Sequence, residues 1–231
     1  ADGKTVASYE YNVEVTKKVV EYAHARGVTV EAELGTLGGI EDGHGADQIN
    51  LTDPVQAVEF VKATGVDCLA VAIGTSHGAY KSLNIGPDGK PQPPTLAMDR
   101  IVEINKRMPG TPMVMHGSSS VPQELVEEIN KYGGKMKAAF GIPMEQIQQG
   151  IKNGVRKINV DTDGRLKITA TIRKIFAENP GEFDPRKYLG PARDGLAELI
   201  AGKMRDFGQA GHAGDFEQKS LDDMKRFYQS A

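Results

Sequence analysis

The chain has 231 residues, and its 28 Lys and Arg against 31 Asp and Glu residues give a formal net charge of −3. A charge this small argues against nucleic acid or an anionic membrane held by bulk electrostatics, and no apolar run reaches the ~18 residues of a membrane-spanning helix. The single cysteine, Cys68, excludes a disulfide within the chain and fits a reducing compartment, so we expect a cytoplasmic protein.

Short apolar runs alternate with segments of helical periodicity along most of the chain. The apolar runs predict four strands, at 28–34, 68–73, 112–115 and 155–160. The periodic segments predict helices at 13–25, 54–64, 96–107 and 122–132, with Ser120 as the cap of the last one. Strand–helix alternation at intervals of about 40 residues indicates parallel βαβ units. The four units share no side-chain pattern, which favours a barrel or doubly wound sheet over a solenoid.

The C-terminal part of the chain is polar and helical. Helices are predicted at 166–179 and 189–207, joined by an ordered connector that includes 183–186. The Gly-rich stretch 208–215 is interpreted as a flexible linker, and 221–228 as a short terminal helix or an interface tail. We therefore expect residues 1–207 to form part of one domain, and residues 208–231 to be a linker and tail.

Polar and ionisable side chains gather where the predicted strands end. Glu31 and Glu33 lie on one face of the first strand, because side chains two positions apart in a strand share a face. His77 and His116 follow the second and third strands, and residues 159–163 follow the fourth. The carboxyl ends of parallel strands meet at one face of a sheet or barrel, so we expect these groups to converge.

Two histidines are candidate metal ligands. The imidazole nitrogens of His77 and His116, with a carboxylate oxygen of Glu33, suit a borderline ion such as Zn²⁺. Ordinary hydrogen-bonded histidines are the alternative interpretation of the same residues. The other three histidines are interpreted as solvated side chains: His24, His44 and His212.

Gly and Ser residues beside these histidines have the composition of an anion cradle. Gly78, Gly117 and residues 118–120 can point backbone amides and hydroxyls at phosphate oxygens, next to a predicted helix N-terminus. Lys81 and Arg165 are close enough in sequence to reach the same anion. Plain turn chemistry is the alternative for any one Gly-Ser pair.

Residues 35–47 form a long loop with five Gly residues. A loop of this length is often a functional lid that closes over substrate. Glu41 and Asp42 are its candidate acid/base residues.

Four motifs, in order and in register, carry a family resemblance: VEAELGTLGG, AIGTSHGAYK, MHGSSSVP and KINVDTDGRL. They closely resemble the class II, metal-dependent fructose-bisphosphate aldolases, and the resemblance covers nearly the whole chain. It implies an α/β fold, the (β/α)8 TIM barrel, of which this chain holds the last four βα units and the C-terminal helices. It also implies a homodimer or homotetramer that acts in glycolysis, gluconeogenesis or the Calvin cycle. The implied reaction is the reversible cleavage of fructose 1,6-bisphosphate to dihydroxyacetone phosphate and glyceraldehyde 3-phosphate through a zinc-stabilised enediolate.

The resemblance also implies roles for single residues. His77 and His116 resemble two of the three histidine ligands of the zinc ion, and Glu33 resembles a ligand of a second metal position. Glu41 resembles the acid/base residue of the mobile loop. The resemblance extends to a monovalent cation as a further cofactor, and to the residues that bind dihydroxyacetone phosphate: Gly78, Lys81, Gly117, Ser118, Ser119, Asn159, Val160, Asp161 and Thr162.

Three further roles concern the sugar and its second phosphate. Asp161 resembles the residue that reads the sugar and favours fructose over tagatose bisphosphate. Arg165 and Arg186 resemble the binders of the far phosphate, with Arg186 acting across a subunit interface.

One feature of the family is missing from the sequence. The family carries an Asp-His pair on an earlier strand, and no Asp-His occurs here. We therefore expect this chain to be an incomplete barrel that alone lacks activity, binds zinc weakly and self-associates. The alternatives are a tagatose-bisphosphate aldolase, a non-catalytic phosphate-binding half-barrel and a Schiff-base aldolase. The last is disfavoured because neither Lys81 nor Lys157 is expected in a strand interior where burial would desolvate its amine.

Overall fold

A parallel sheet of four strands forms the centre of the computed structural model, which describes residues 7–41, 44–46, 49–79, 84–85, 87–89 and 91–230. All three strand pairs are parallel, and the order in the sheet follows the order in the chain. The predicted strands are confirmed, each with shorter bounds than its apolar run. The strands are β1 (Glu31–Leu34), β4 (Cys68–Val71), β7 (Met113–Met115) and β8 (Val155–Ile158).

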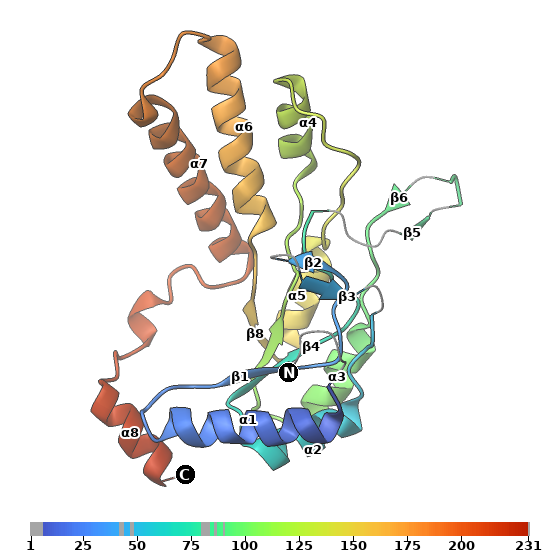
Figure 1. The fold of residues 1–231 in the computed structure, drawn as a ribbon, viewed down its shortest axis with the longest axis vertical. Coiled ribbons are helices and arrows are strands. Elements are labelled where there is room, and N and C mark those ends of the chain that lie inside the picture. The colour runs from blue at the N-terminus through green and yellow to red at the C-terminus, as the bar shows by residue number, and fades with distance from the viewer. Residues whose placement is uncertain are drawn as a thin grey trace.

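Helices precede, connect and follow the strands of this sheet (Figure 1). In chain order they are α1 (Tyr9–His24), α2 (Pro54–Thr64), α3 (Met98–Arg107), α4 (Gln123–Lys131), α5 (Met144–Lys152), α6 (Thr162–Glu178), α7 (Pro185–Asp206) and α8 (Leu221–Ser230). The helix predicted at 54–64 has the predicted bounds. Its N-cap, Asp53, accepts hydrogen bonds from two backbone amides, and Gly65 ends it in the left-handed conformation at φ 73°.

The hydrophobic core lies along the two central strands. The side chains of Leu69, Val71 and residues 113–115 are at most 1% exposed, which fits strands buried on both faces. Phe60 of α2 and Ile101 of α3 pack against this layer. The outer strands β1 and β8 are more polar, and this difference leaves charged side chains at the two edges of the sheet.

Several boundaries differ from the sequence-based expectation. Helix α5 was not predicted, and α7 begins at Pro185 because the Asp184 side chain accepts from the amide of Arg186. Residues 183–186 are therefore a helix start rather than only a connector. Ser120 does not cap α4, since the N-cap position belongs to Pro122 and makes no side-chain hydrogen bond.

The predicted lid contains a short hairpin. Strand β2 (Gly39–Glu41) pairs antiparallel with β3 (His44–Ala46), and isolated bridges tie the segment to Asn50 and Ser76. A second small hairpin joins β5 (Asn84–Ile85) to β6 (Pro91–Gln92). Asp42 lies outside the described residues.

The last helices extend away from the sheet. Helices α6 and α7 lie side by side as an antiparallel pair on one side of α4 (Figure 1). After α7, a short 3₁₀ helix (Ala213–Asp215) leads to α8, which packs against α1, so part of the predicted linker is ordered. None of the described helices is both long enough and apolar enough to cross a membrane.

Candidate active site

A cavity of about 610 Å³ lies where β4, β7 and β8 end. Its lining combines the segments that follow these three strands with the start of α6. The convergence expected from the sequence is thereby observed. The candidate residues that the cavity brings together are His77, Gly78, His116, Gly117, Ser119, Asn159, Asp161, Thr162 and Arg165.

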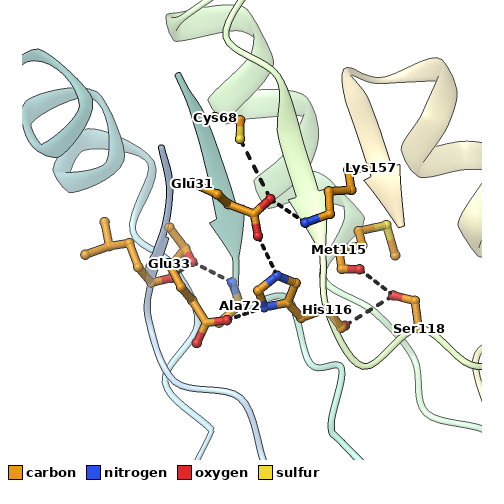
Figure 2. Close-up of polar contacts among 10 residues, drawn as sticks. Glu31, Glu33, Cys68, Ala72, Met115, His116, Ser118 and Lys157 are labelled. Carbon is orange, nitrogen blue, oxygen red and sulfur yellow. Dashed lines mark hydrogen bonds and ion pairs between the residues drawn. The ribbon is translucent and has the colours of Figure 1, made fainter. Parts of the chain in front are cut away.

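His116 is held between two carboxylates of β1 (Figure 2). Its Nδ1 lies 2.7 Å from Glu33 Oε2, and its Nε2 lies 2.9 Å from Glu31 Oε1. The hydrogen bond to Glu33, with that to Glu31, raises the pKa of His116 although burial opposes its charge. The two carboxylates therefore fix the orientation of the imidazole, as is usual for histidines that act in a site.

Glu31 also contacts the opposite edge of the sheet. The ammonium of Lys157, on β8, lies 2.8 Å from Glu31 Oε2, and Cys68 Sγ lies 3.8 Å from the same oxygen (Figure 2). Burial opposes ionisation of Glu31, but the hydrogen bonds from Lys157 and His116 outweigh it and lower the pKa of Glu31. Lys157 was expected outside a desolvated strand interior, and it is the third residue of β8. Its side chain is nevertheless 55% exposed and ion-paired.

His77 lies beside His116 in the cavity. Its backbone amide donates to the carbonyl of Gly38, and the two imidazole ring centroids are 6.3 Å apart. Within the described residues, no three His, Cys, Asp or Glu side chains converge so as to hold a metal ion. The structure thus brings the two imidazoles near each other, with Glu33 as the carboxylate beside His116.

The segments that were predicted as two parts of an anion cradle touch each other. Gly117 has φ 60°, and a Cβ atom built on it would lie 2.5 Å from the carbonyl oxygen of Ser76. No larger residue fits this approach without a shift of the backbone. Next to Ser76, the buried hydroxyl of Thr75 has no hydrogen-bond partner in the described part of the chain. Such an atom costs about 1–3 kcal/mol unless a partner is supplied.

The adjacent serines have internal partners. Ser118 is fully buried, and its hydroxyl lies within hydrogen-bond distance of the carbonyls of Met115 and His116. Ser119 Oγ accepts from the backbone amides of Asp161, at 3.2 Å, and Thr162, at 3.1 Å. Ser119 thus joins the segment after β7 to the start of α6.

Asp161 and Arg165 form an ion pair at the rim. Arg165 Nε lies 2.8 Å from Asp161 Oδ2, and both side chains are more than half exposed. Val160 does not line the same cavity. It lines a neighbouring apolar cavity of about 580 Å³ with Ile158 and Phe207.

Other candidate residues lie apart or outside the described structure. Arg186 begins α7, pairs with Asp184 and is 88% exposed, at the end of the α6–α7 pair remote from the sheet (Figure 1). It does not join Arg165 within one chain. Lys81 lies outside the described residues, and of Glu41 the structure describes the backbone, in β2 opposite His44.

The remaining histidines divide into two kinds. His24 was expected to be solvated, and this is wrong. Its Nε2 lies 2.9 Å from Asp67 Oδ2, and its ring stacks on Tyr228 at 3.8 Å between centroids. His212 is exposed and contacts Asp215, as expected for a solvated residue. The side chain of His44 lies outside the described residues.

Sequence reasoning missed a buried acid beside the cavity. Asp163 is 0% exposed and contacts Lys203 of α7 at 2.8 Å. The motif DTD places two acids two residues apart, but a local pattern does not show which of them is buried. The ion pair with Lys203, 40 positions away, is what allows Asp163 to be the buried one.

Comparisons with known proteins agree with the motifs. Residues 2–212 match the family model described as fructose-bisphosphate aldolase class-II. The chain is 52% identical to a fructose-bisphosphate aldolase of Xanthobacter flavus over 99% of its own length and 67% of that protein. It is 54% identical to a Giardia intestinalis fructose-bisphosphate aldolase over 95% of this chain and 66% of the relative. The chain thus spans about two thirds of the length of these relatives.

Solved structures show the same fold. A candidate fructose-1,6-biphosphate aldolase from Coccidioides immitis superposes with a TM-score of 0.66 at 26% identity, covering 91% of this chain and 62% of that one. The YdjI aldolase from Escherichia coli K12 gives a TM-score of 0.64 at 28% identity, covering 90% and 60%. The expected fold class, an α/β chain that forms part of a TIM barrel, is confirmed.

Proposed function

This chain belongs to the family of class II fructose-bisphosphate aldolases, and from that premise we propose that it carries the substrate-binding face of such an enzyme. The proposed reaction is the reversible cleavage of fructose 1,6-bisphosphate to dihydroxyacetone phosphate and glyceraldehyde 3-phosphate. The observation that carries the proposal is the cavity at the strand ends, which gathers two imidazoles, a Gly-Ser loop and a helix start. In a barrel enzyme, this is the face at which catalysis occurs.

Zinc is the proposed metal, with His77 and His116 as two of its ligands. Their nitrogens suit Zn²⁺, and Glu33 stands beside His116 as a carboxylate for a second metal position. The described residues do not complete a ligand set, so the fit is partial. A bound divalent ion would supply Lewis-acid stabilisation of the negative charge that develops beside the ketone.

The chain's own residues bind and orient the substrate. The loop of Gly117 and Ser119 and the start of α6 provide amides and a helix N-terminus, which favour one phosphate group of the sugar. Asp161 is positioned at the rim to contact the sugar hydroxyls, and Arg165 beside it to contact the second phosphate. Glu41 is the proposed acid/base residue that moves a proton to or from carbon.

The assembly and cellular setting belong to the same proposal. We place the enzyme in the cytoplasm as a homodimer or homotetramer, with a monovalent cation as a second cofactor. Because Arg186 is exposed and far from the cavity of its own chain, it is proposed to reach the far phosphate in a neighbouring subunit.

Two alternative functions are distinguished from the proposed one by single residues. Asp161 favours fructose over tagatose bisphosphate as substrate. Lys157 would be the Schiff-base candidate on the sheet, but its side chain is half exposed and ion-paired with Glu31, whereas a Schiff-base lysine is activated in a desolvated pocket.

The test compares two polypeptides. The first is residues 1–231, and the second, the joined form, fuses them to the part of the Xanthobacter flavus aldolase that they do not cover. We expect the joined form to cleave fructose 1,6-bisphosphate, to lose activity on chelation and to regain it with Zn²⁺. Residues 1–231 alone are expected to be inactive, and borohydride with substrate is expected to trap nothing.

Three results would contradict this proposal. Borohydride trapping at Lys157 would replace metal chemistry with a Schiff base. Faster cleavage of tagatose 1,6-bisphosphate than of the fructose isomer would show that the tagatose isomer is the preferred substrate. A joined form that binds phosphate but cleaves neither sugar would favour the non-catalytic phosphate-binding module.

A further inference from the structure

We propose that Asp163, neutralised by Lys203, is the positioning residue that holds the Gly-Ser wall of the cavity in the shape that binds a phosphate group. The wall is defined as residues 117–120, of which Gly117 and Ser119 line the cavity. The inference rests on the proposed function, because it takes the cavity to be the site of a substrate phosphate. Asp163 itself does not line the cavity, so its role is to orient other groups.

The carboxylate of Asp163 binds the far end of this wall through three hydrogen bonds. Its Oδ2 accepts from the backbone amide of Ser120 at 3.0 Å and from the Ser120 hydroxyl at 2.9 Å. Its Oδ1 accepts from the amide of Val121 at 2.8 Å. A carboxylate with this many donors is a rigid anchor, since charge-assisted hydrogen bonds are the strong ones.

Lys203 makes the burial of this charge possible. Asp163 is 0% exposed and the Lys203 side chain 13%, and Lys203 Nζ lies 2.8 Å from Asp163 Oδ2. The same ammonium donates to the hydroxyl of Ser120. A buried carboxylate without such a partner would be strongly destabilising. The pair also keeps the neighbourhood of the wall electrically neutral, so that a buried acid does not repel a bound anion.

The backbone that Asp163 binds at Val121 has an unfavourable conformation. Val121 has φ 49°, in the left-handed region that β-branched residues rarely adopt. The hydrogen bond from its amide to Asp163 and its burial at 1% exposure keep it there. This unusual turn lets the chain pass from the wall directly into α4.

The wall and the start of α6 hold each other from both sides. Ser119 Oγ accepts from the amides of Asp161 and Thr162, while Asp163, one residue further on, accepts from the amides of Ser120 and Val121. A change at Asp163 therefore moves both the wall and the helix start toward which a phosphate would bind.

Two further contacts fix the wall from behind. The amide of Ile142 donates to the carbonyl of Ser119, and a Cβ atom on Gly141 would lie 2.2 Å from that carbonyl oxygen. At the other end, Gly117 rests on Ser76. Contacts from several sides thus hold the wall, and the contact from Asp163 is the one made by a carboxylate.

The experiment measures the binding of inorganic phosphate to residues 1–231 by calorimetry, for the natural chain and for Asp163→Asn. The expected result is a dissociation constant at least about tenfold higher in the variant, because an amide cannot accept from two backbone amides and a lysine with equal strength. The matched control is Asp67→Asn. Asp67 is also a networked acid, but it lies at the other end of the sheet.

Three further variants keep the test decisive if Asp163→Asn fails to fold. Ser120→Ala removes one of the three hydrogen bonds and leaves the ion pair, and is expected to weaken phosphate binding about threefold. Lys203→Arg keeps the charge and is expected to retain most of the affinity, whereas Lys203→Met is expected to lose it. The amide resonances of residues 117–119 should shift in Asp163→Asn and stay unchanged in Asp67→Asn.

The outcomes separate this inference from the proposed function. Equal phosphate affinity in the natural chain and Asp163→Asn, or an equal loss in Asp67→Asn, would overturn the positioning role. A natural chain that does not bind phosphate would also overturn it. If the joined form cleaves substrate and Asp163→Asn raises its KM with little change in kcat, both proposals are supported. If the joined form is inactive but phosphate binding still depends on Asp163, the proposed function falls and the positioning role stands.

Discussion

Asp67 and Asp163 anchor opposite ends of the same sheet, and their surroundings differ. At the amino end, Asp67 accepts from the amide of Val30 at 2.7 Å and from the Tyr228 hydroxyl at 2.8 Å, and contacts His24. These partners belong to α1, to α8 and to the residue that precedes β1. At the carboxyl end, Asp163 secures a loop whose other face lines a cavity. The same chemistry therefore serves helix packing at one end and the wall of a cavity at the other, and the carboxyl end is the functional face of α/β barrels in general.

The two ends of the sheet also differ in how fully their polar groups are paired within the described residues. The network around Asp67 is closed by the stacked rings of His24 and Tyr228. Within the described part of the chain, the carboxyl end holds a buried hydroxyl without a hydrogen-bond partner, that of Thr75, and a half-exposed charge, that of Lys157. Mutations should consequently cost folding stability at the amino end and ligand binding at the carboxyl end.

The largest expected effect is at the carboxyl end. His116→Ala in the joined form should lower kcat/KM for fructose 1,6-bisphosphate more than roughly 100-fold. Mutation of a residue that only orients a metal ligand typically lowers metal affinity or activity about 10–100-fold, so removal of a ligand itself should cost more. Bound zinc should fall in parallel, measured by elemental analysis. The thermal midpoint should move little, since the side chain is partly exposed. A variant with natural turnover and metal content would remove His116 from the proposed ligand set.

A matched pair of glycines separates the two ends. Gly117 and Gly27 both have positive φ, and a Cβ on Gly27 would lie 2.9 Å from the carbonyl oxygen of Leu221. Each substitution by Ala should cost about 1–3 kcal/mol of backbone strain. Gly27→Ala should lower the free energy of unfolding and leave phosphate affinity unchanged, whereas Gly117→Ala should weaken phosphate binding. Equal effects of both variants on binding would break the comparison.

Tyr228→Phe should have a smaller effect, limited to the amino end. Loss of its hydrogen bond to Asp67 should lower the free energy of unfolding by about 0.5–1.5 kcal/mol. Hydrogen exchange should speed up in α8 and remain unchanged in α6. Faster exchange in α6 would show that the two ends are coupled.

The smallest expected effect concerns the reactivity of Cys68, the first residue of β4. Burial, and then the negative charge of Glu31, raises the pKa of Cys68 to about 11. The thiol form therefore persists at neutral pH, and the reactive thiolate forms only as the pH approaches that value. Iodoacetamide should modify the folded chain slowly at pH 7.5 and faster at pH 10, measured by mass spectrometry. Urea-unfolded chain is the control, and rapid labelling of folded chain at pH 7.5 would contradict the assignment.

The sequence predicts the parts of the fold that local signals determine. The strands around residues 68–73 and 112–115 are continuous apolar runs, and Asp53, Pro54 and Gly65 mark both ends of α2. Helix α5 was missed because it is nine residues long, contains a Gly and follows a Gly-rich stretch. The convergence of the strand ends was predictable because parallel strands share their direction.

Other features depend on contacts between distant residues. Glu31 and Lys157 are 126 positions apart, and only the curvature of the sheet brings them together. The burial of Asp163 depends on Lys203 in the same way. His24 has no local sign of a partner, since Asp67 and Tyr228 reach it from other elements. Arg186 lies far from the cavity of its own chain, so its proposed role depends on a neighbouring subunit, which no local pattern encodes.

The contact between Glu31 and Lys157 also bears on the order of folding. It joins the first and the last strand of the sheet, so it forms only after both intervening strands have taken their places. Closing so long a loop carries a large entropic cost and comes late, when most of the sheet is already built. We therefore expect this contact to be absent from the folding transition state, so that its removal would speed the opening of the folded sheet and leave the rate of its formation unchanged.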